Sequence, residues 1–352
     1  TAHCVTWSHD HISGVADVTE DRREFAARRE RMSLLAHVRK VELPDGASVM
    51  VGGGLVEDVD LGNFVAVRAT DVLWVSATPL ITGDSRTSAL AAALAWFSRG
   101  SGVAAINILD SLTPGLTARR AAYFSTPVRV LDANAAVATP TDFEPTVAAR
   151  ADHLEFTEVF RGAGADVVVE HGRVTAEVEG LEVARVVDEG GVPTMQIGVG
   201  AHDREMFTLL NGTTATSDQL RSVVQTVLQH RRAGAPTHPL NLLAPERALR
   251  KRVVSNPSLI GARNLRNAEP PVPRTNVKDS VPCCALGEDE HGPLLAVFVA
   301  GIDLDAVPFA ADARSYLAPD ARLLIVTASR NIVPAQTRMA DMLVRHAEFV
   351  SA

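Results

Sequence analysis

Leu294-Leu295-Ala296-Val297-Phe298-Val299-Ala300 is the stretch that decides the fold class, because this strand-sized apolar run opens a regular series of elements. Helical spacing of apolar residues follows over 309–317, and a second apolar run covers 322–327. A further helix is expected over 334–344, with a closing strand near Phe349. Alternation of strands with helices of this length is typical of proteins that combine a sheet with covering helices.

Residues 72–131 predict the same order of elements. The expected elements are a strand over 72–76, a helix with Leu90, Leu94 and Phe97 on one face, a strand over 103–109, a helix over 117–124 and a strand over 128–131. We therefore expect an α/β (mixed α+β) fold with internally duplicated hairpin-loop-helix and β-α-β-α units, in which mixed sheets are flanked by helices.

Hairpins and helices are also predicted in the remaining segments. The N-terminal part predicts a helix over 19–38, a hairpin of 38–43 with 48–51 around Pro44-Asp45-Gly46, and a hairpin of 64–68 with 72–76. The middle predicts a helix over 151–160, hairpins of 166–169 with 174–178 and of 181–187 with 194–199, and a helix over 203–210.

The length of 352 residues predicts more than one domain. Residues 133–149 contain two prolines and little periodicity, so we expect a linker there. The predicted division is an N-terminal α/β domain over 1–132 and a C-terminal α/β domain over 150–352. A Pro-rich insertion is expected at 268–282.

Composition excludes several classes of function. A net charge of −8 makes general nucleic-acid binding unlikely, and no apolar stretch reaches the 18 residues of a membrane span. Without a signal peptide, the expected location is cytoplasmic, which favours reduced thiols for the three cysteines. Lysine occurs only at Lys40, Lys251 and Lys278, and none lies in a P-loop or kinase motif.

Three loops that follow predicted strands carry an acid before a helix: Asp84, Asp203 and Asp303. Ligands of α/β proteins bind at the carboxyl ends of strands, so these loops are candidate sites. His202 and Asp203 are the strongest catalytic candidates, because a neutral histidine beside an aspartate can act as a general base. The alternative is that each acid only caps the helix that follows it.

Asp166 and Glu177 lie on two successive predicted strands, with Glu179 two residues further on. The segment from Gly164 to Glu179 resembles the metal-binding half of the PD-(D/E)XK nuclease core. The resemblance implies that Asp166 and Glu177 hold Mg²⁺ against a scissile phosphate. Glu179 departs from the family pattern, because a lysine is expected there to stabilise the charge that develops on the phosphate.

Two functions therefore remain open. One is a metal-dependent hydrolase or phosphoesterase with a degenerate nuclease-like core that uses Asp166, Glu177, His202 and Asp203. The other is a non-catalytic binding or assembly protein. Arginine-rich helices around 22–31 and 247–252 are typical of solvated surfaces, although they also suit an anionic ligand or an acidic partner. The sequence leaves open whether the partner is a small molecule, a protein or a second copy of the chain.

Overall fold

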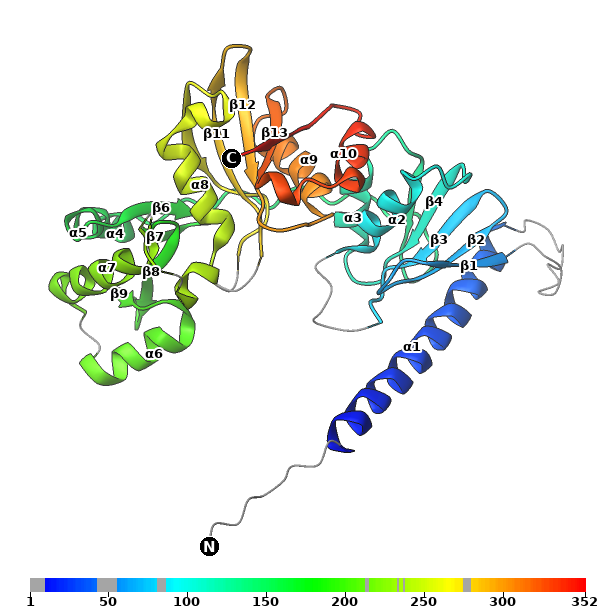
Figure 1. Cartoon of the computed structure of the whole chain (residues 1–352), viewed down its shortest axis with the longest axis horizontal. Coiled ribbons are helices and arrows are strands. Elements are labelled where there is room, and N and C mark those ends of the chain that lie inside the picture. Colours follow the sequence, from blue (N-terminus) through cyan, green and yellow to red (C-terminus); the bar gives the residue numbers. More distant parts are fainter. Residues whose placement is uncertain are drawn as a thin grey trace, which may run out of the picture. The chain divides into compact units, whose positions relative to one another are not determined.

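The computed structural model describes residues 10–42, 56–80, 87–212, 215–232, 234–236, 238–274 and 280–352 (Figure 1). The chain forms two compact units, Thr1–Thr141 and Asp142–Ala352. The boundary lies inside the segment 133–149 for which the sequence predicts a linker. No helix in the described ranges is long and apolar enough to cross a membrane.

The described part of the first unit contains a long helix, a five-stranded sheet and two shorter helices. The strands, in sheet order, are β1 (Val56–Asp60), β2 (Val65–Ala69), β3 (Val72–Ser76), β4 (Ala105–Leu109) and β5 (Val128–Leu131). The first three are antiparallel, whereas β3, β4 and β5 are parallel. Helix α1 (Asp10–Glu42) packs Leu34 and Val38 against Trp74, while α2 (Ala89–Phe97) and α3 (Pro114–Ala121) connect the parallel strands.

The second unit contains a sheet with the same strand order and the same directions. Its strands are β10 (Asn264–Ala268), β11 (Cys283–Asp289), β12 (Gly292–Phe298), β13 (Arg322–Thr327) and β14 (Glu348–Ser351). Helices α9 (Ala306–Leu317) and α10 (Pro334–Asp341) connect the parallel strands, and α8 (Pro245–Ser255) precedes the sheet. The mixed fold and the element order predicted for residues 72–131 and for the tail are confirmed.

The four-stranded sheet of the second unit has a different plan. Its strands β6 (Asp166–Glu170), β7 (Arg173–Val178), β8 (Leu181–Glu189) and β9 (Val192–Ile197) are all antiparallel and adjacent in sequence. The helices around it are α4 (Ala151–Leu154), α5 (Phe156–Gly162), α6 (Gly200–Asn211) and α7 (Ser217–Arg231). Asp203 therefore follows an antiparallel edge strand, whereas Asp303 follows β12, which has a parallel neighbour. The two acids are not in equivalent positions.

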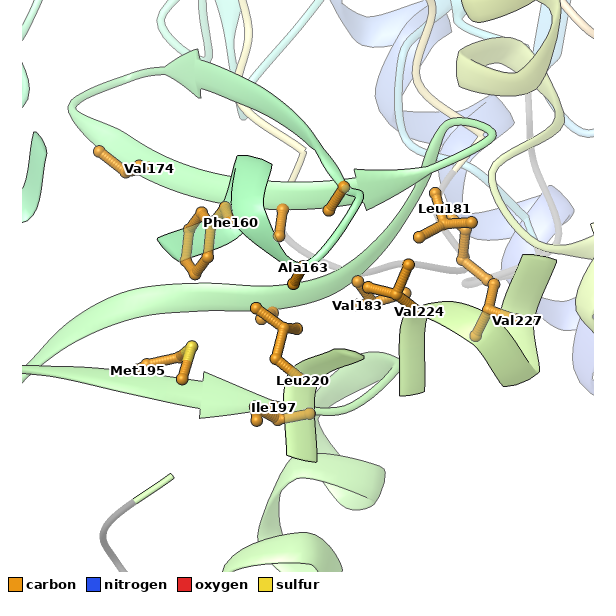
Figure 2. Packing of buried hydrophobic residues seen from close by; sticks show 14 of the residues in the cluster. Phe160, Ala163, Val174, Leu181, Val183, Met195, Ile197, Leu220, Val224 and Val227 are labelled. Carbon is orange, nitrogen blue, oxygen red and sulfur yellow. The ribbon is translucent and has the colours of Figure 1, made fainter. Parts of the chain in front are cut away.

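One face of this four-stranded sheet is an apolar core. Figure 2 shows Phe160 of α5 together with Leu220 and Val224 of α7 against the strand side chains. All three are almost completely buried. A capping box at Thr216 and Gln219 fixes the start of α7. Because side chains alternate along a strand, the opposite face of the sheet presents the intervening residues, which on β6 and β7 include Asp166, Glu170, Thr175 and Glu177 beside the buried Val168.

Three details differ from the sequence-based expectations. The segment from Val38 to Glu42 continues α1, so the first arm of the predicted N-terminal hairpin is wrong; its second arm lies outside the described residues. Strands β1 and β10, helix α7 and the short 3-10 helices were not predicted. The 3-10 helices are η1 (Pro239–Leu242), η2 (Pro257–Ile260) and η3 (Ser329–Asn331). The predicted Pro-rich insertion joins the paired strands β10 and β11, and 275–279 lie outside the described part.

Candidate functional site: the polar face of the four-stranded sheet

Carboxylates dominate the polar face of β6 and β7. Asp166 and Glu177 are direct partners in the antiparallel register, so their side chains leave the same face of the sheet. Glu170 lies four residues after Asp166 and shares that face. The prediction that the nuclease-like segment folds as a hairpin around His171-Gly172 is confirmed, and the hairpin places three acids on one face of the sheet.

Helix α8 covers these acids with cations. Arg247, Arg250 and Lys251 stand three and four residues apart, which puts them on one side of the helix. The other side packs Leu249 and Val253 into the core of the five-stranded sheet. Pro245 suits the first turn of the helix because its missing N–H is not needed there. Helix α8 thus connects an apolar core to a charged sheet face.

Arg247 is the centre of the resulting ion-pair network. Its guanidinium donates hydrogen bonds to Glu170 and to Glu177. Arg250 Nη1 donates to Glu170 Oε1 over 2.6 Å, and Arg250 Nη2 lies 3.8 Å from Glu177 Oε2 without a hydrogen bond. Only 1% of the Arg250 side chain and 5% of the Glu177 side chain are exposed, so water screens these charges little. We name Glu170, Glu177, Arg247 and Arg250 the buried ion-pair cluster.

Burial and pairing oppose each other in this cluster. For Glu170, burial raises the pKa, but Arg250 and Arg247 outweigh it and the pKa falls below its ordinary value. For Glu177, burial prevails over both arginines and raises the pKa. Burial alone lowers the pKa of Arg247, yet Glu177 and Glu170 raise it above its ordinary value. Arg247 therefore stays charged, and of the two glutamates Glu177 is the one whose protonation burial favours.

Lys251 binds the remaining acid of the hairpin. Its Nζ lies 2.8 Å from Asp166 Oδ1 and 2.7 Å from Oδ2, at a partly exposed position. Sequence reasoning missed this contact, because it looked for a lysine at the position of Glu179. Glu179 instead forms the β7–β8 turn with a positive φ of 47°, and its carbonyl accepts a hydrogen bond from Arg231. The signal in the sequence is the spacing of Arg247, Arg250 and Lys251, because it puts the three cations on one side of a helix.

The two catalytic candidates lie elsewhere. His202 and Asp203 are exposed in the first turn of α6, and the carboxylate of Asp203 accepts a hydrogen bond from the backbone N–H of Val199 over 2.6 Å. Val199, not Asp203, is the N-cap. Because α6 follows β9 and Asp166 lies on β6, three strand spacings of about 4.8 Å separate them across the sheet. The structure therefore brings Asp166 and Glu177 together but does not join His202 or Asp203 to them.

Acids at other strand ends also have structural partners. Asp303 accepts a hydrogen bond from the N–H of Asp305, and Gln336 donates to its carbonyl. Asp110, which sequence reasoning did not single out, accepts hydrogen bonds from the N–H groups of Leu112 and Thr113. These contacts are those of turns and helix caps. Asp84 lies outside the described residues.

A second polar cluster joins distant segments of the second unit. The N–H of His171 donates to Glu269 Oε2 over 2.6 Å, and the Tyr316 hydroxyl donates to Glu269 Oε1 over 3.2 Å. Thr146 shares a hydrogen bond with the same hydroxyl. His171 Nε2 is buried and has no hydrogen-bond partner. A substrate cannot reach this nitrogen in the observed arrangement, so the cluster does not form an accessible general base.

The described residues present neither a metal-ligand group nor an exposed thiol. Over the ranges that the structure describes, no group of three or more His, Cys, Asp or Glu side chains is arranged to hold a metal ion. Cys283 and Cys284 are free and buried, and burial raises the pKa of Cys283 to about 11. A thiol in that state is a weak nucleophile at neutral pH.

Comparison with known proteins adds no family to this picture. The chain matches no protein-family model, no curated protein and no solved structure.

Proposed function

We propose that this chain acts by binding a partner and not by metal-dependent hydrolysis. The observation that carries the proposal is the position of Glu177, which lies buried between Arg247 and Arg250. A divalent cation needs carboxylate oxygens that are free to coordinate it. In this sheet the guanidinium groups already compensate the charge of the carboxylates, and removing them would leave buried acids without partners.

A hydrolase or phosphoesterase remains the second candidate function, because one observation favours it. Lys251 lies against Asp166 and would supply the cation that the nuclease-like pattern lacks at Glu179. In that mechanism Asp166 and Glu177 would hold Mg²⁺ while Lys251 stabilised the charge developing on a phosphate. Glu177 would first have to exchange Arg247 for the metal.

Metal titration separates the two functions. We expect millimolar Mg²⁺, Mn²⁺ or Zn²⁺ to leave the melting temperature of the wild-type chain unchanged, since an ion that binds the native state must raise it. Asp166→Asn serves as the site variant. Asp218→Asn is the control, because that carboxylate is exposed on α7. A saturable rise with Mg²⁺ or Mn²⁺ that Asp166→Asn abolishes and Asp218→Asn retains would establish a metal site and favour the hydrolase.

A further inference from the structure

Strand β14 is an open edge of the second five-stranded sheet. It stands last in the strand order and pairs in parallel with β13. The N–H of Ala352 donates to the carbonyl of Thr327 on β13 over 3.1 Å. Because the backbone groups of successive residues in a strand point to opposite sides, Phe349 and Ser351 direct their N–H and C=O groups away from β13. Within the ranges that the structure describes, no hydrogen bond reaches these outward groups.

The corresponding strand of the first unit shows how such an edge is completed. β5 is also last in its sheet, and the carbonyl of Val130 accepts a hydrogen bond from the N–H of Ala138 over 2.9 Å. On the same side, the N–H of Asp132 donates to the carbonyl of Ala136 over 2.9 Å. The chain thus turns back and adds an antiparallel segment to β5. Since β5 and β14 hold the same place and direction in their sheets, β14 offers its outward groups to the same kind of segment.

The side chains at this edge lie at the rim of an apolar core. Val350 and Ala352 pack against the core that α8 covers with Val253, but both are only partly buried. Glu348 shares their face of the sheet, and its carboxylate is paired with Arg322 over 3.0 Å. An added strand that sets an apolar residue against Val350 would therefore extend the core without burying an unpaired charge.

We propose that two copies of the chain associate by pairing their β14 strands in antiparallel orientation about a two-fold axis. The outward groups can bond only if Phe349 of one copy pairs with Ser351 of the other, which fixes the register. Val350 then faces Val350 of the second copy, and Glu348 faces Ala352. A pair of β-branched residues is favourable at such a position, and no like charges meet. The two apolar cores become continuous across the axis.

The other described sheet edges of the second unit are less suited to a second copy. Pairing β6 with itself about Val168 would bring Asp166 opposite Glu170, and like charges directly opposite each other destabilise a sheet. β9 contains Pro193, which has no N–H to donate. Pairing β10 about its central residue would set Arg266 against its own copy. The dimer proposed at β14 uses no residue of the polar sheet face, so it is independent of the function proposed for that face.

Sedimentation velocity over a concentration series tests the association. Ser351→Pro removes an N–H that only the second copy would use, whereas Ser351→Ala keeps it and is the matched control. Because strands of this length bury little area, we expect a weak dimer that dissociates on dilution through the micromolar range. The wild type and Ser351→Ala should approach twice the monomer mass as the concentration rises. Ser351→Pro should keep the monomer mass and the wild-type melting temperature.

Three results would overturn the dimer at β14. The first is a wild type that stays monomeric at every concentration, and the second is a Ser351→Pro variant that associates as the wild type does. The third is a clear loss of stability in Ser351→Pro, because it would show that this N–H serves the sheet of its own chain.

A disulfide across the two-fold axis tests the register. Val350 and its copy would form a non-hydrogen-bonded pair with Cα atoms about 4.5 Å apart, a distance that a disulfide can span. Val350→Cys in a Cys4→Ser background should therefore give a cross-linked dimer in an oxidising glutathione buffer, while Cys283 and Cys284 stay buried. Glu348→Cys in the same background is the control, because four residues, or about 13 Å along the strand, separate it from its copy.

Cross-linking of Val350→Cys but not of Glu348→Cys is the expected result. Equal cross-linking of the two variants, or none of either, would contradict the two-fold pairing. None of these results alters the metal titration, so the two proposals fail separately.

Discussion

Replacing Arg247 with methionine is expected to lower the free energy of unfolding by about 3–5 kcal/mol at pH 7. The methionine fills much of the volume of the arginine, but Glu177 loses its hydrogen bond and keeps only the 3.8 Å ion pair with Arg250 and the weaker field of Arg274. Glu170 keeps Arg250 and loses its second cation. Two buried carboxylates would then share one guanidinium, and an uncompensated buried charge is among the costliest single defects in a protein.

Urea denaturation of Arg247→Met at several pH values measures this effect. Without Arg247 the two glutamates bind protons more readily in the folded than in the unfolded state, so the loss of stability should grow as the pH rises above about 4.5. In the wild type, the lowered pKa of Glu170 stabilises the fold above its unfolded pKa, and this contribution is lost as the pH falls.

Arg252→Met is the control for the loss of a charge from the same helix. Since Arg252 is exposed, we expect a change within about 0.5 kcal/mol. Equal small effects of the two substitutions would show that Arg247 is not buried in an ion-pair cluster.

Replacing Gly180 with alanine is expected to cost about 2–5 kcal/mol, for two separate reasons. Gly180 has a φ of +76°, where an L-residue is unfavourable by about 1–2 kcal/mol. A Cβ atom would also lie 2.4 Å from the backbone carbon of Arg247, so α8 would have to move away from the β7–β8 turn. Forcing extra volume into a packed contact adds about 1–3 kcal/mol.

Gly190→Ala separates the two contributions. Gly190 has a φ of +59° in the β8–β9 turn, but its Cβ would meet nothing within 4 Å. This variant should therefore show only the backbone cost of about 1–2 kcal/mol. Thermal denaturation of both variants gives the difference, which reports the close approach of α8. If Gly180→Ala proves no worse than Gly190→Ala, α8 does not pack directly on the turn.

Elements with a strong local pattern could be predicted from the sequence. The buried runs of β12, β13 and β4 and the hairpins around His171-Gly172 and Gly190-Gly191 have clear apolar or turn signals. Strands β1 and β10 were missed because their sequences, VEDVD and NLRNA, are polar and short. Such edge strands are fixed by pairing with β2 and β11, which no local pattern reveals.

Prediction of the candidate site is limited in the same way, because contacts between distant parts of the sequence leave no local pattern. The sequence predicted that Asp166 and Glu177 lie on neighbouring strands, because the hairpin between them is local. It did not predict their partners, since Lys251 is 85 residues from Asp166 and Arg247 is 70 residues from Glu177. Tertiary contacts alone determine which arginines of α8 are buried. Arg252 is exposed, whereas Arg250 is fully buried.

A double-mutant cycle between Glu177 and Arg247 tests most directly whether the nuclease-like acids are partners of α8. The free energies of unfolding of the wild type, Glu177→Gln, Arg247→Met and the double variant would be measured at pH 7. We predict a coupling energy of about 1–3 kcal/mol, with the double variant much less destabilised than the sum of the single variants. A coupling energy within about 0.5 kcal/mol of zero would contradict the account, because it would leave Glu177 free for another partner.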